Sequence, residues 1–267
     1  MSASSNPYQI LLVDDLALFR RSMQARLGAL GVPISSVASV PEARLWIETQ
    51  LPSLILLDVV LPGVDGFTYC RELKADPRTR PVPIIMLTDL RTNAYERSLE
   101  AGADDYLPKR VDDAIMRIRV KLHLQLADLR KRDGMQPPPE LPAHILLATP
   151  SSIIQAQIPV QFSGTHHAFR VVDGAEDVVS ALQSTDTLVI MDMALGIEGV
   201  QEALTVLRMD PATSHIPVLL LMEKDEAELL AGIEFMIDDV IWKPLKAQVN
   251  RARFMHLVEL GLRSLPR

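Results

Sequence analysis

The stretch from Ser53 to Gly63 reads Ser-Leu-Ile-Leu-Leu-Asp-Val-Val-Leu-Pro-Gly. Four apolar residues lead directly into Asp58, and a Pro-Gly turn follows. A continuous apolar run bounded by turn signals is typical of a strand buried on both faces of a parallel sheet. Asp58 would then lie at the carboxyl end of that strand, where open α/β sheets bind ligands, and we expect it to be exposed enough to react. Taken alone, the stretch favours the simpler interpretation of an acid that solvates a turn.

Strand and helix patterns alternate five times between residues 9 and 132. Each expected strand is a short apolar run, and the expected helices are separated from the strands by Gly, Pro and Asp residues. Such alternation predicts a doubly wound parallel sheet with helices on both faces, which is a flavodoxin-like (βα)5 domain. The expected strands cover residues 9–13, 36–40, 54–58, 82–87 and 105–107, and the expected helices cover 17–30, 41–50, 66–74, 92–101 and 111–132.

A proline-rich segment, residues 133–143, separates this pattern from a second copy of itself. A constant offset across separate motifs indicates a duplicated domain. We therefore predict two such domains in tandem, residues 1–132 and residues 144–267, joined by a stiff linker. Three pairs of residues are each 134 positions apart: Asp58 and Asp192, Thr88 and Met222, and Lys109 and Lys243.

Reactive or charged side chains follow the expected strands of the first copy. Because parallel strands end at the same edge of a sheet, we expect these side chains to share one crevice. Three close carboxylates repel one another unless a cation is present, and Asp oxygens suit Mg²⁺, which also binds phosphate. The acid that ends the central strand could then attack a phosphoryl group, while Mg²⁺ and the lysine neutralise charge and the threonine donates a hydrogen bond to the new phosphate. The five residues are Asp14, Asp15, Asp58, Thr88 and Lys109.

This constellation has the order and spacing of a known family. Residues 9–132 resemble the response-regulator receiver domain of two-component signalling, through Asp14-Asp15, Asp58, Leu61-Pro62-Gly63, Asp65-Gly66, Thr88, residues 101–106 and Lys109. The resemblance implies that Asp58 is the phosphoacceptor and that Asp15, Asp58 and the Val60 carbonyl bind Mg²⁺ directly. It further implies that Asp14 acts through a bridging water, and that Tyr106 turns inward when Thr88 moves.

One departure from the family concerns the loop after the lysine. Receiver domains usually have a proline after this lysine, often with a cis peptide bond. Here Arg110 follows Lys109, and Pro108 precedes it. The departure affects the expected geometry of the loop, while the ammonium group itself is present.

The second copy retains less of the site. Thr149-Pro150 stands in place of the acid pair, Met222 in place of Thr88, and Val240 in place of Tyr106. Asp192 and Lys243 remain, and we expect them to form an ion pair in the crevice, with Pro244 following the lysine as in the family. Glu223 is a candidate substitute acid. With two of three carboxylates lost, we expect weak Mg²⁺ binding and a receiver-like domain that accepts no phosphate.

Composition excludes several other classes of protein. The 267 residues carry a formal net charge of −7, which argues against nonspecific binding to nucleic acid or anionic membranes. The single cysteine, Cys70, excludes a disulfide framework, and we expect a packed thiol. We expect His166 and His167 to be solvated or locally packed. No apolar run has membrane-spanning length, so we expect a soluble, cytoplasmic protein.

Three functional hypotheses remain. In the first, a histidine kinase or phosphotransfer protein phosphorylates Asp58, and the second domain is an adaptor or dimerisation surface. The helix over 111–132 is apolar on more than one face, which suits packing on the second domain or on another copy of the chain. In the second, Asp58 is a turnover nucleophile of a phosphatase, but Val60 stands where such enzymes place a second Asp. In the third, the chain is a scaffold with a vestigial pocket.

The output of the signalling module is left open. An active receiver followed by a degenerate one resembles the input half of diguanylate cyclases that carry two receivers before a GGDEF domain. No GG[DE]EF motif occurs in the sequence, so either the chain is a fragment of such an enzyme or its output lies in a partner protein. A DNA-binding output is unsupported, because no helix-turn-helix pattern follows the second copy.

Overall fold

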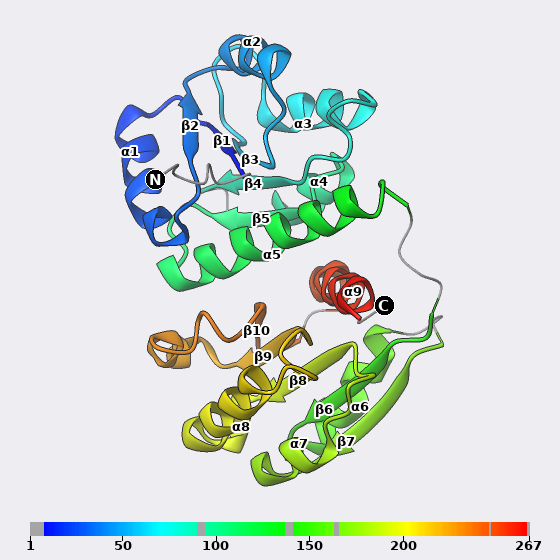
Figure 1. The fold of residues 1–267 in the computed structure, drawn as a ribbon. Coiled ribbons are helices and arrows are strands. Elements are labelled where there is room, and N and C mark those ends of the chain that lie inside the picture. The colour runs from blue at the N-terminus through cyan, green and yellow to red at the C-terminus, as the bar shows by residue number, and fades with distance from the viewer. Residues whose placement is uncertain (1–7, 90–93, 137–140, 163–165, 246, 266–267) are drawn as a thin grey trace, which may run out of the picture. The chain divides into compact units, whose positions relative to one another are not determined.

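A computed structural model describes residues 8–89, 94–136, 141–162, 166–245 and 247–265 (Figure 1). The chain divides into two compact units, Met1–Met135 and Gln136–Arg267. Each unit contains a five-stranded parallel sheet flanked by helices. The predicted fold class, two doubly wound flavodoxin-like domains in tandem, is confirmed.

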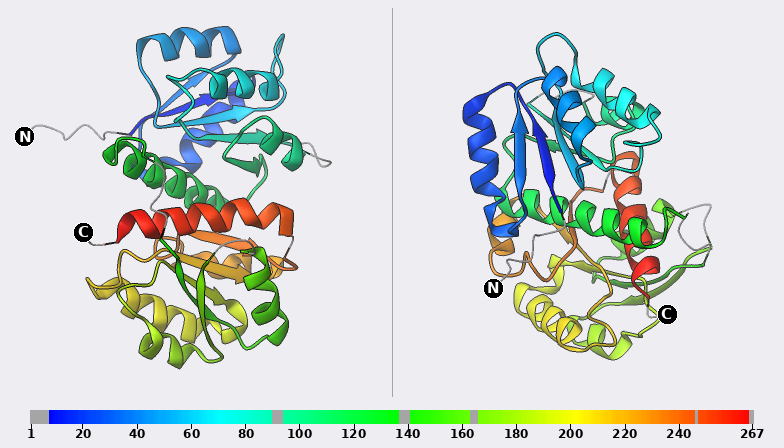
Figure 2. Two further views of the ribbon diagram at one scale, coloured as in Figure 1. Left: turned by 90° about the vertical axis from the view of Figure 1, so that its right-hand side faces the viewer. Right: turned by 45° about the horizontal axis from the view of Figure 1, so that its top comes forward.

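The first unit alternates strands and helices along the chain. Its sheet has the order β2-β1-β3-β4-β5, and every neighbouring pair of strands is parallel. In both views of Figure 2 and in Figure 1, α1 and α5 cover one face of this sheet and α2 and α3 cover the other. The elements are β1 (Ile10–Val13), α1 (Ala17–Arg26), η1 (Gly28–Leu30), β2 (Ile34–Val37), α2 (Val40–Thr49), β3 (Leu54–Asp58), α3 (Gly66–Ala75), β4 (Ile84–Thr88), α4 (Ala94–Glu100), β5 (Asp105–Pro108) and α5 (Asp113–Arg132).

The core of the first unit follows from the alternation of side chains along its strands. One set of strand residues packs with α2 and α3, and every large side chain so buried contributes about 1.5–3 kcal/mol to folding. Cys70 belongs to this cluster, and burial raises the pKa of its thiol to about 11. The expectation of a packed thiol is therefore confirmed. The strand residues of the cluster are Leu11, Val13, Ile55, Leu57, Ile84 and Met86.

Most expected elements differ from the observed ones by one or more residues at an end, and three of them are described here. The second strand lies at Ile34–Val37 rather than 36–40, because Ser39 caps α2: its hydroxyl accepts a hydrogen bond from Glu42 N, and Ala38 N donates to the Glu42 carboxylate at 3.0 Å. The first helix ends at Arg26 and is followed by the short 3₁₀ helix η1. The helix expected over 92–101 is α4, and residues 92 and 93 lie outside the described residues.

The second unit repeats the topology of the first. Its sheet has the order β10-β9-β8-β6-β7, which is the order of the first sheet read from the other edge. Between β9 and β10 it has the 3₁₀ helix η3 where the first unit has α4. The elements are β6 (His144–Ala148), α6 (Ser152–Gln161), β7 (Ala168–Val172), α7 (Ala175–Ala181), β8 (Leu188–Asp192), η2 (Met193–Leu195), α8 (Ile197–Met209), β9 (Val218–Met222), η3 (Lys224–Leu230), β10 (Asp239–Trp242) and α9 (Ala247–Ser264).

The segment between the units is described in part. Helix α5 ends at Arg132 and β6 begins at His144, while residues 137–140, which include the three consecutive prolines, lie outside the described residues. The division at Met135 falls within the segment predicted as a linker. Among the described helices, none combines the length and the apolar character needed to cross a lipid bilayer.

Candidate functional site

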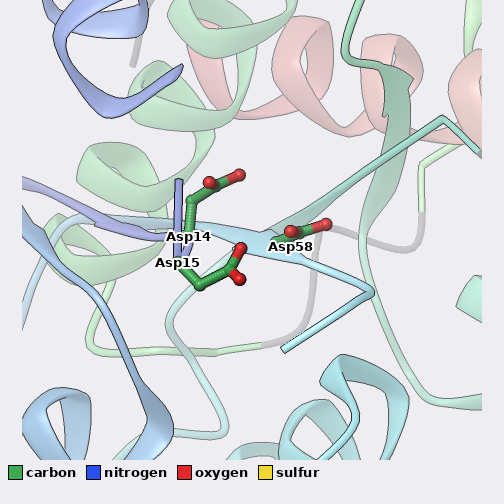
Figure 3. A group of neighbouring side chains, drawn as sticks. All are labelled: Asp14, Asp15 and Asp58. Atoms are coloured by element: carbon green, nitrogen blue, oxygen red, sulfur yellow. The ribbon is translucent and has the colours of Figure 1, made fainter. Parts of the chain in front are cut away.

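Three carboxylates meet at the carboxyl edge of the first sheet. Asp14 and Asp15 directly follow β1, and Asp58 is the last residue of β3, so the parallel pairing of β1 with β3 places them side by side (Figure 3). One oxygen from each carboxylate lies within 4.8 Å of the others. Asp15 is exposed, whereas Asp14 is fully buried. The three acids predicted to share a crevice therefore do so.

Asp58 is more buried than we expected from its place at the end of a strand. It is 2% exposed, because β3 is the central strand and Asp58 still pairs with Leu87 of β4. Helix α3 also begins close to its main chain: a Cβ built on Gly66 would lie 2.1 Å from the Asp58 carbonyl oxygen. The expectation of an exposed carboxylate is therefore wrong, because Asp58 is almost fully buried.

Lys109 supplies the positive charge at this site. Its Nζ lies 2.6 Å from Asp14 Oδ2 and 2.7 Å from Asp58 Oδ2, and it sits over the ring of Phe19 at 4.6 Å from the centroid. Burial lowers the pKa of Lys109, but its ion pairs with Asp14 and Asp58 outweigh burial and raise the pKa overall. Burial raises the pKa of Asp58, and Lys109 opposes this effect only in part. One ammonium group thus faces three carboxylates.

The main chain around the acids is held by hydrogen bonds. Val60 N donates to Asp58 Oδ1 at 3.2 Å, and the Val60 side chain is exposed. Leu16 N donates to Asp14 Oδ1 at 2.9 Å. Arg20 donates to the carbonyl oxygens of Asp14 at 2.6 Å and Asp15 at 2.9 Å. These contacts fix the acid pair on β1.

Thr88 and Tyr106 lie on the two strands beyond Asp58. Thr88 is the last residue of β4 and is 1% exposed, and its carbonyl accepts a hydrogen bond from Lys109 N at 3.1 Å. Tyr106 is half-buried in β5 opposite Met86, and burial together with the charge of Asp89 raises its pKa. The roles predicted for both residues require a phosphorylated state and stay predictions.

Three residues of the site were missed by sequence reasoning, and all lie on α1. They are Phe19 against the Lys109 ammonium, Arg20 on the Asp14 and Asp15 carbonyls, and Arg26 on the loop after Lys109. No sequence signal distinguishes these arginines from solvated ones, because their contacts to the site are made to main-chain carbonyls. The absence of a proline after Lys109 was the one sequence feature that could have pointed to an additional contact with this loop.

At the corresponding edge of the second sheet, protein side chains pair with the acid that ends the central strand. Asp192 is fully buried, and its Oδ1 lies 2.9 Å from Lys243 Nζ while its Oδ2 accepts from the Thr149 hydroxyl at 2.8 Å. The ion pair predicted there is confirmed. Glu223, the candidate substitute acid, reaches Lys243 at 3.4 Å but is exposed and caps η3. The peptide bond between Lys243 and Pro244 is cis.

The histidine pair has a structural role in the second unit. His167 Nδ1 accepts a hydrogen bond from Ala143 N at 3.0 Å, and its ring packs edge-on against Phe162. Burial lowers the pKa of His167, with a smaller effect from His166. The expectation that this pair is locally packed is confirmed for His167. In the described part of the chain, the grouping of three potential metal ligands occurs at Asp14, Asp15 and Asp58.

The fold and this edge together define a class of protein. A doubly wound α/β domain with an acid cluster and a lysine at the carboxyl edge of its sheet has the arrangement expected of a receiver domain. Residues 10–121 match the family model described as the response regulator receiver domain. The first unit therefore contains a response regulator receiver domain.

Known relatives agree with this assignment. Response regulator PleD of Caulobacter vibrioides is 28% identical over 268 residues, which covers 92% of this chain and 58% of PleD. Transcriptional regulatory protein AfsQ1 of Streptomyces coelicolor is 34% identical over 126 residues, covering 47% of this chain and 55% of AfsQ1. The chain thus spans little more than half the length of these curated relatives.

A solved structure also matches. The receiver domain of sensor histidine kinase PA1611 from Pseudomonas aeruginosa, described with a magnesium ion coordinated in its active site cleft, is 35% identical. The match covers 45% of this chain and 96% of that domain, with a TM-score of 0.39. The alignment with PleD, by contrast, extends over both units of this chain.

Proposed function

We propose that Asp58 accepts a phosphoryl group from a histidine kinase or a phosphotransfer protein, and that the chain relays this modification to an output domain or effector protein. The observation that supports the proposal is the acid cluster at the end of β3, where Asp58 lies 2.7 Å from Lys109 and beside two further carboxylates. The site is built on strand ends, which hold its groups rigidly.

The residues present fit a hard divalent cation. All donors are oxygens, and three carboxylates outnumber the one ammonium that contacts two of them. We propose that Asp15, Asp58 and the Val60 carbonyl bind Mg²⁺ directly and that Asp14 binds it through water. When bound, the ion neutralises charge on the phosphoryl oxygens. All other groups of the site are side chains and main-chain atoms of the protein itself.

The protein's own residues carry the transfer step. A carboxylate oxygen of Asp58 attacks phosphorus, the bond from phosphorus to the donor imidazole nitrogen breaks, and the products are an acyl phosphate and a neutral imidazole after proton uptake. The Lys109 ammonium pairs with the transferred phosphoryl oxygens instead of the Asp58 carboxylate. The Thr88 hydroxyl then donates to the phosphate, and Tyr106 turns into the space that Thr88 leaves.

The second unit acts in this proposal as an adaptor or a dimerisation surface. Asp192 lacks a neighbouring acid pair, since Thr149 and Pro150 stand in its place and the Thr149 hydroxyl donates to Asp192, so we assign Asp192 no role as a phosphoacceptor. The output is a diguanylate cyclase domain or a separate effector, and two copies of the chain associate when Asp58 is phosphorylated. Direct binding to nucleic acid or membranes is not part of the proposal, given the net charge of −7.

The test is phosphorylation of the purified chain by acetyl phosphate with Mg²⁺, read by intact mass and by size exclusion. We expect one phosphoryl group on the wild type and on Asp192→Asn, none on Asp58→Asn, and a shift toward dimer that accompanies the modification. Phosphate that survives Asp58→Asn and is lost in Asp192→Asn would reverse the roles of the two units. No phosphate and no Mg²⁺ binding in the wild type would instead favour the scaffold hypothesis.

A further inference from the structure

The loop that carries Lys109 lacks the restraint found in its counterpart. In the second unit Pro244 follows Lys243, and a residue before proline is restricted to extended conformations. Arg110 follows Lys109, so the backbone of Lys109 has no such restriction. The turn itself is closed by one main-chain hydrogen bond, from Val111 N to the Pro108 carbonyl at 3.0 Å.

Arg26 holds this loop from the end of α1. Its guanidinium donates to the carbonyl oxygen of Lys109 at 3.1 Å and to the carbonyl oxygen of Val111, and its Nε lies 2.5 Å from Asp113 Oδ1. The Arg26 side chain is only 16% exposed. A guanidinium carries its donors on three nitrogens in a planar fork, so it can reach acceptors spread along one loop, whereas all donors of a lysine lie on one atom.

The contact is part of a continuous face of α1. Phe19, Met23 and Arg26 stand at positions i, i+4 and i+7, which share one side of a helix. Phe19 lies against the Lys109 ammonium, and Arg26 binds the carbonyl of the same residue. Met23 is fully buried, and its Sδ is 3.9 Å from Arg26 Nη1. Helix α1 thus contacts both the ammonium group and the main-chain carbonyl of Lys109.

The second unit provides an internal comparison. Gln161 ends α6 as Arg26 ends α1, and both helices have ten residues. Gln161 is buried and its Oε1 has no hydrogen-bond partner, and among the described residues no hydrogen bond joins its amide to the loop after Lys243. One unit therefore has the arginine without the proline, and the other has the proline without the arginine.

We infer that Arg26 is a positioning residue for Lys109, taking the part that a proline after the lysine takes in the second unit. The inference rests on the proposed function, since Lys109 is the cation of the proposed phosphoacceptor site. Arg26 fixes the main chain of residues 109–113, so the Lys109 ammonium stays against Asp14 and Asp58. Without it the ammonium would sample positions away from the two carboxylates.

The first test needs no phosphorylation. In Arg26→Met we expect amide hydrogen exchange at Arg110 and Val111, and acetylation of the Lys109 amine, to be faster by about tenfold, as expected when a restrained segment opens locally. The matched control is Arg21→Met, which removes the same charge from an exposed position on the same helix. Exchange and acetylation at wild-type rates in Arg26→Met would overturn the inference, whether or not Asp58 accepts phosphate.

The second test separates positioning from general stability. We expect Arg26→Met to slow phosphorylation by acetyl phosphate about tenfold, because a small displacement of a reacting group is enough for such a loss. Adding Arg110→Pro to Arg26→Met should restore most of the rate, and Arg26→Lys should not. If the proline restores neither the rate nor the slow exchange, Arg26 has no positioning role. A wild type that takes no phosphate counts against the proposed function alone.

Discussion

At the scale of single residues, Gly66 sets how closely α3 approaches the site. Its amide donates to the Val59 carbonyl at 2.9 Å, and the helix begins at this residue. A Cβ at Gly66 would lie 2.1 Å from the Asp58 carbonyl oxygen and 2.9 Å from Val59 Cα, both in the main chain. Since neither atom belongs to a flexible side chain, only a residue without a Cβ fits.

Gly66→Ala should therefore displace the end of β3. We expect the first unit to lose about 1–3 kcal/mol of unfolding free energy, the usual cost of forcing an extra carbon into a packed site. Urea unfolding followed by Trp46 fluorescence, in a Trp242→Phe background, would measure this. Gly28→Ala is the matched control, because no atom lies within 4 Å of its Cβ position. Equal stability of the two variants would contradict this account of Gly66.

The candidate site shows what residue patterns can and cannot predict. Asp14, Asp15, Asp58 and Lys109 could be predicted, because parallel strands must end together and each of these residues follows a strand. The burial of Asp58 could not, since it depends on how closely α3 approaches β3. Arg20 and Arg26 could not either, because they contact the site through main-chain carbonyl oxygens, which every residue has.

At the scale of elements, one ion pair ties α3 to the start of two strands. Lys74 Nζ binds Asp104 Oδ2 at 2.7 Å and the Val82 carbonyl at 2.8 Å, and Asp104 Oδ2 accepts from Ile84 N at 2.9 Å. Burial raises the pKa of Asp104, but Lys74, His123 and these hydrogen bonds outweigh it, so the pKa lies below its usual value. The ionised form of Asp104 is thus the stabilising one.

Asp104→Asn should remove stability in a pH-dependent way. Because the folded pKa of Asp104 is lowered, its contribution is fully present above the ordinary Asp pKa of about 4 and is lost as pH falls through the lowered value. At neutral pH we expect a loss of about 1–3 kcal/mol, typical of a hydrogen-bonded charge. The difference in unfolding free energy from wild type should shrink below pH 4. Glu48→Gln, at an exposed position, should show no such trend.

The second unit builds the same connection from a different cation. Arg208 binds Asp238 Oδ2 at 2.8 Å and the Ile216 carbonyl at 2.8 Å, and Val218 N donates to the same carboxylate oxygen at 2.9 Å. These contacts connect α8 to β9 and β10 as Lys74 connects α3 to β4 and β5. The two units thus share polar contacts that support the fold, while the acid cluster is present in the first.

At the scale of the whole molecule, the five-fold alternation of strand and helix predicted the first sheet, and motifs repeated at a constant offset predicted the second. The apolar runs are unambiguous where strands are buried on both faces, as in β3 and β4. The edge strand β2 is half-buried along its length, and its predicted position was wrong by two or three residues. No sequence pattern that we recognised predicted that the second unit would have the 3₁₀ helix η3 where the first unit has α4.

The difference between the two sites predicts that Mg²⁺ stabilises one unit only. A ligand at 100 times its dissociation constant adds about 2.7 kcal/mol to the folded state that binds it. We expect Mg²⁺ to raise the unfolding temperature reported by Trp46 in the first unit and to leave that reported by Trp242 in the second unchanged. Introducing Thr149→Asp with Pro150→Asp should make the Trp242 transition respond to Mg²⁺. A wild-type Trp242 transition that already responds would contradict the closed second site.

The way each sheet is assembled bears on the synthesis of the chain. All five strands of the first sheet come from consecutive segments that end at Pro108, and all strands of the second begin at His144. Domains generally fold as units as they leave the ribosome, the N-terminal one first. The first sheet can therefore close before any strand of the second has emerged. That order of events keeps two sheets of equal topology from exchanging strands, which is the characteristic misfolding hazard of tandem repeats.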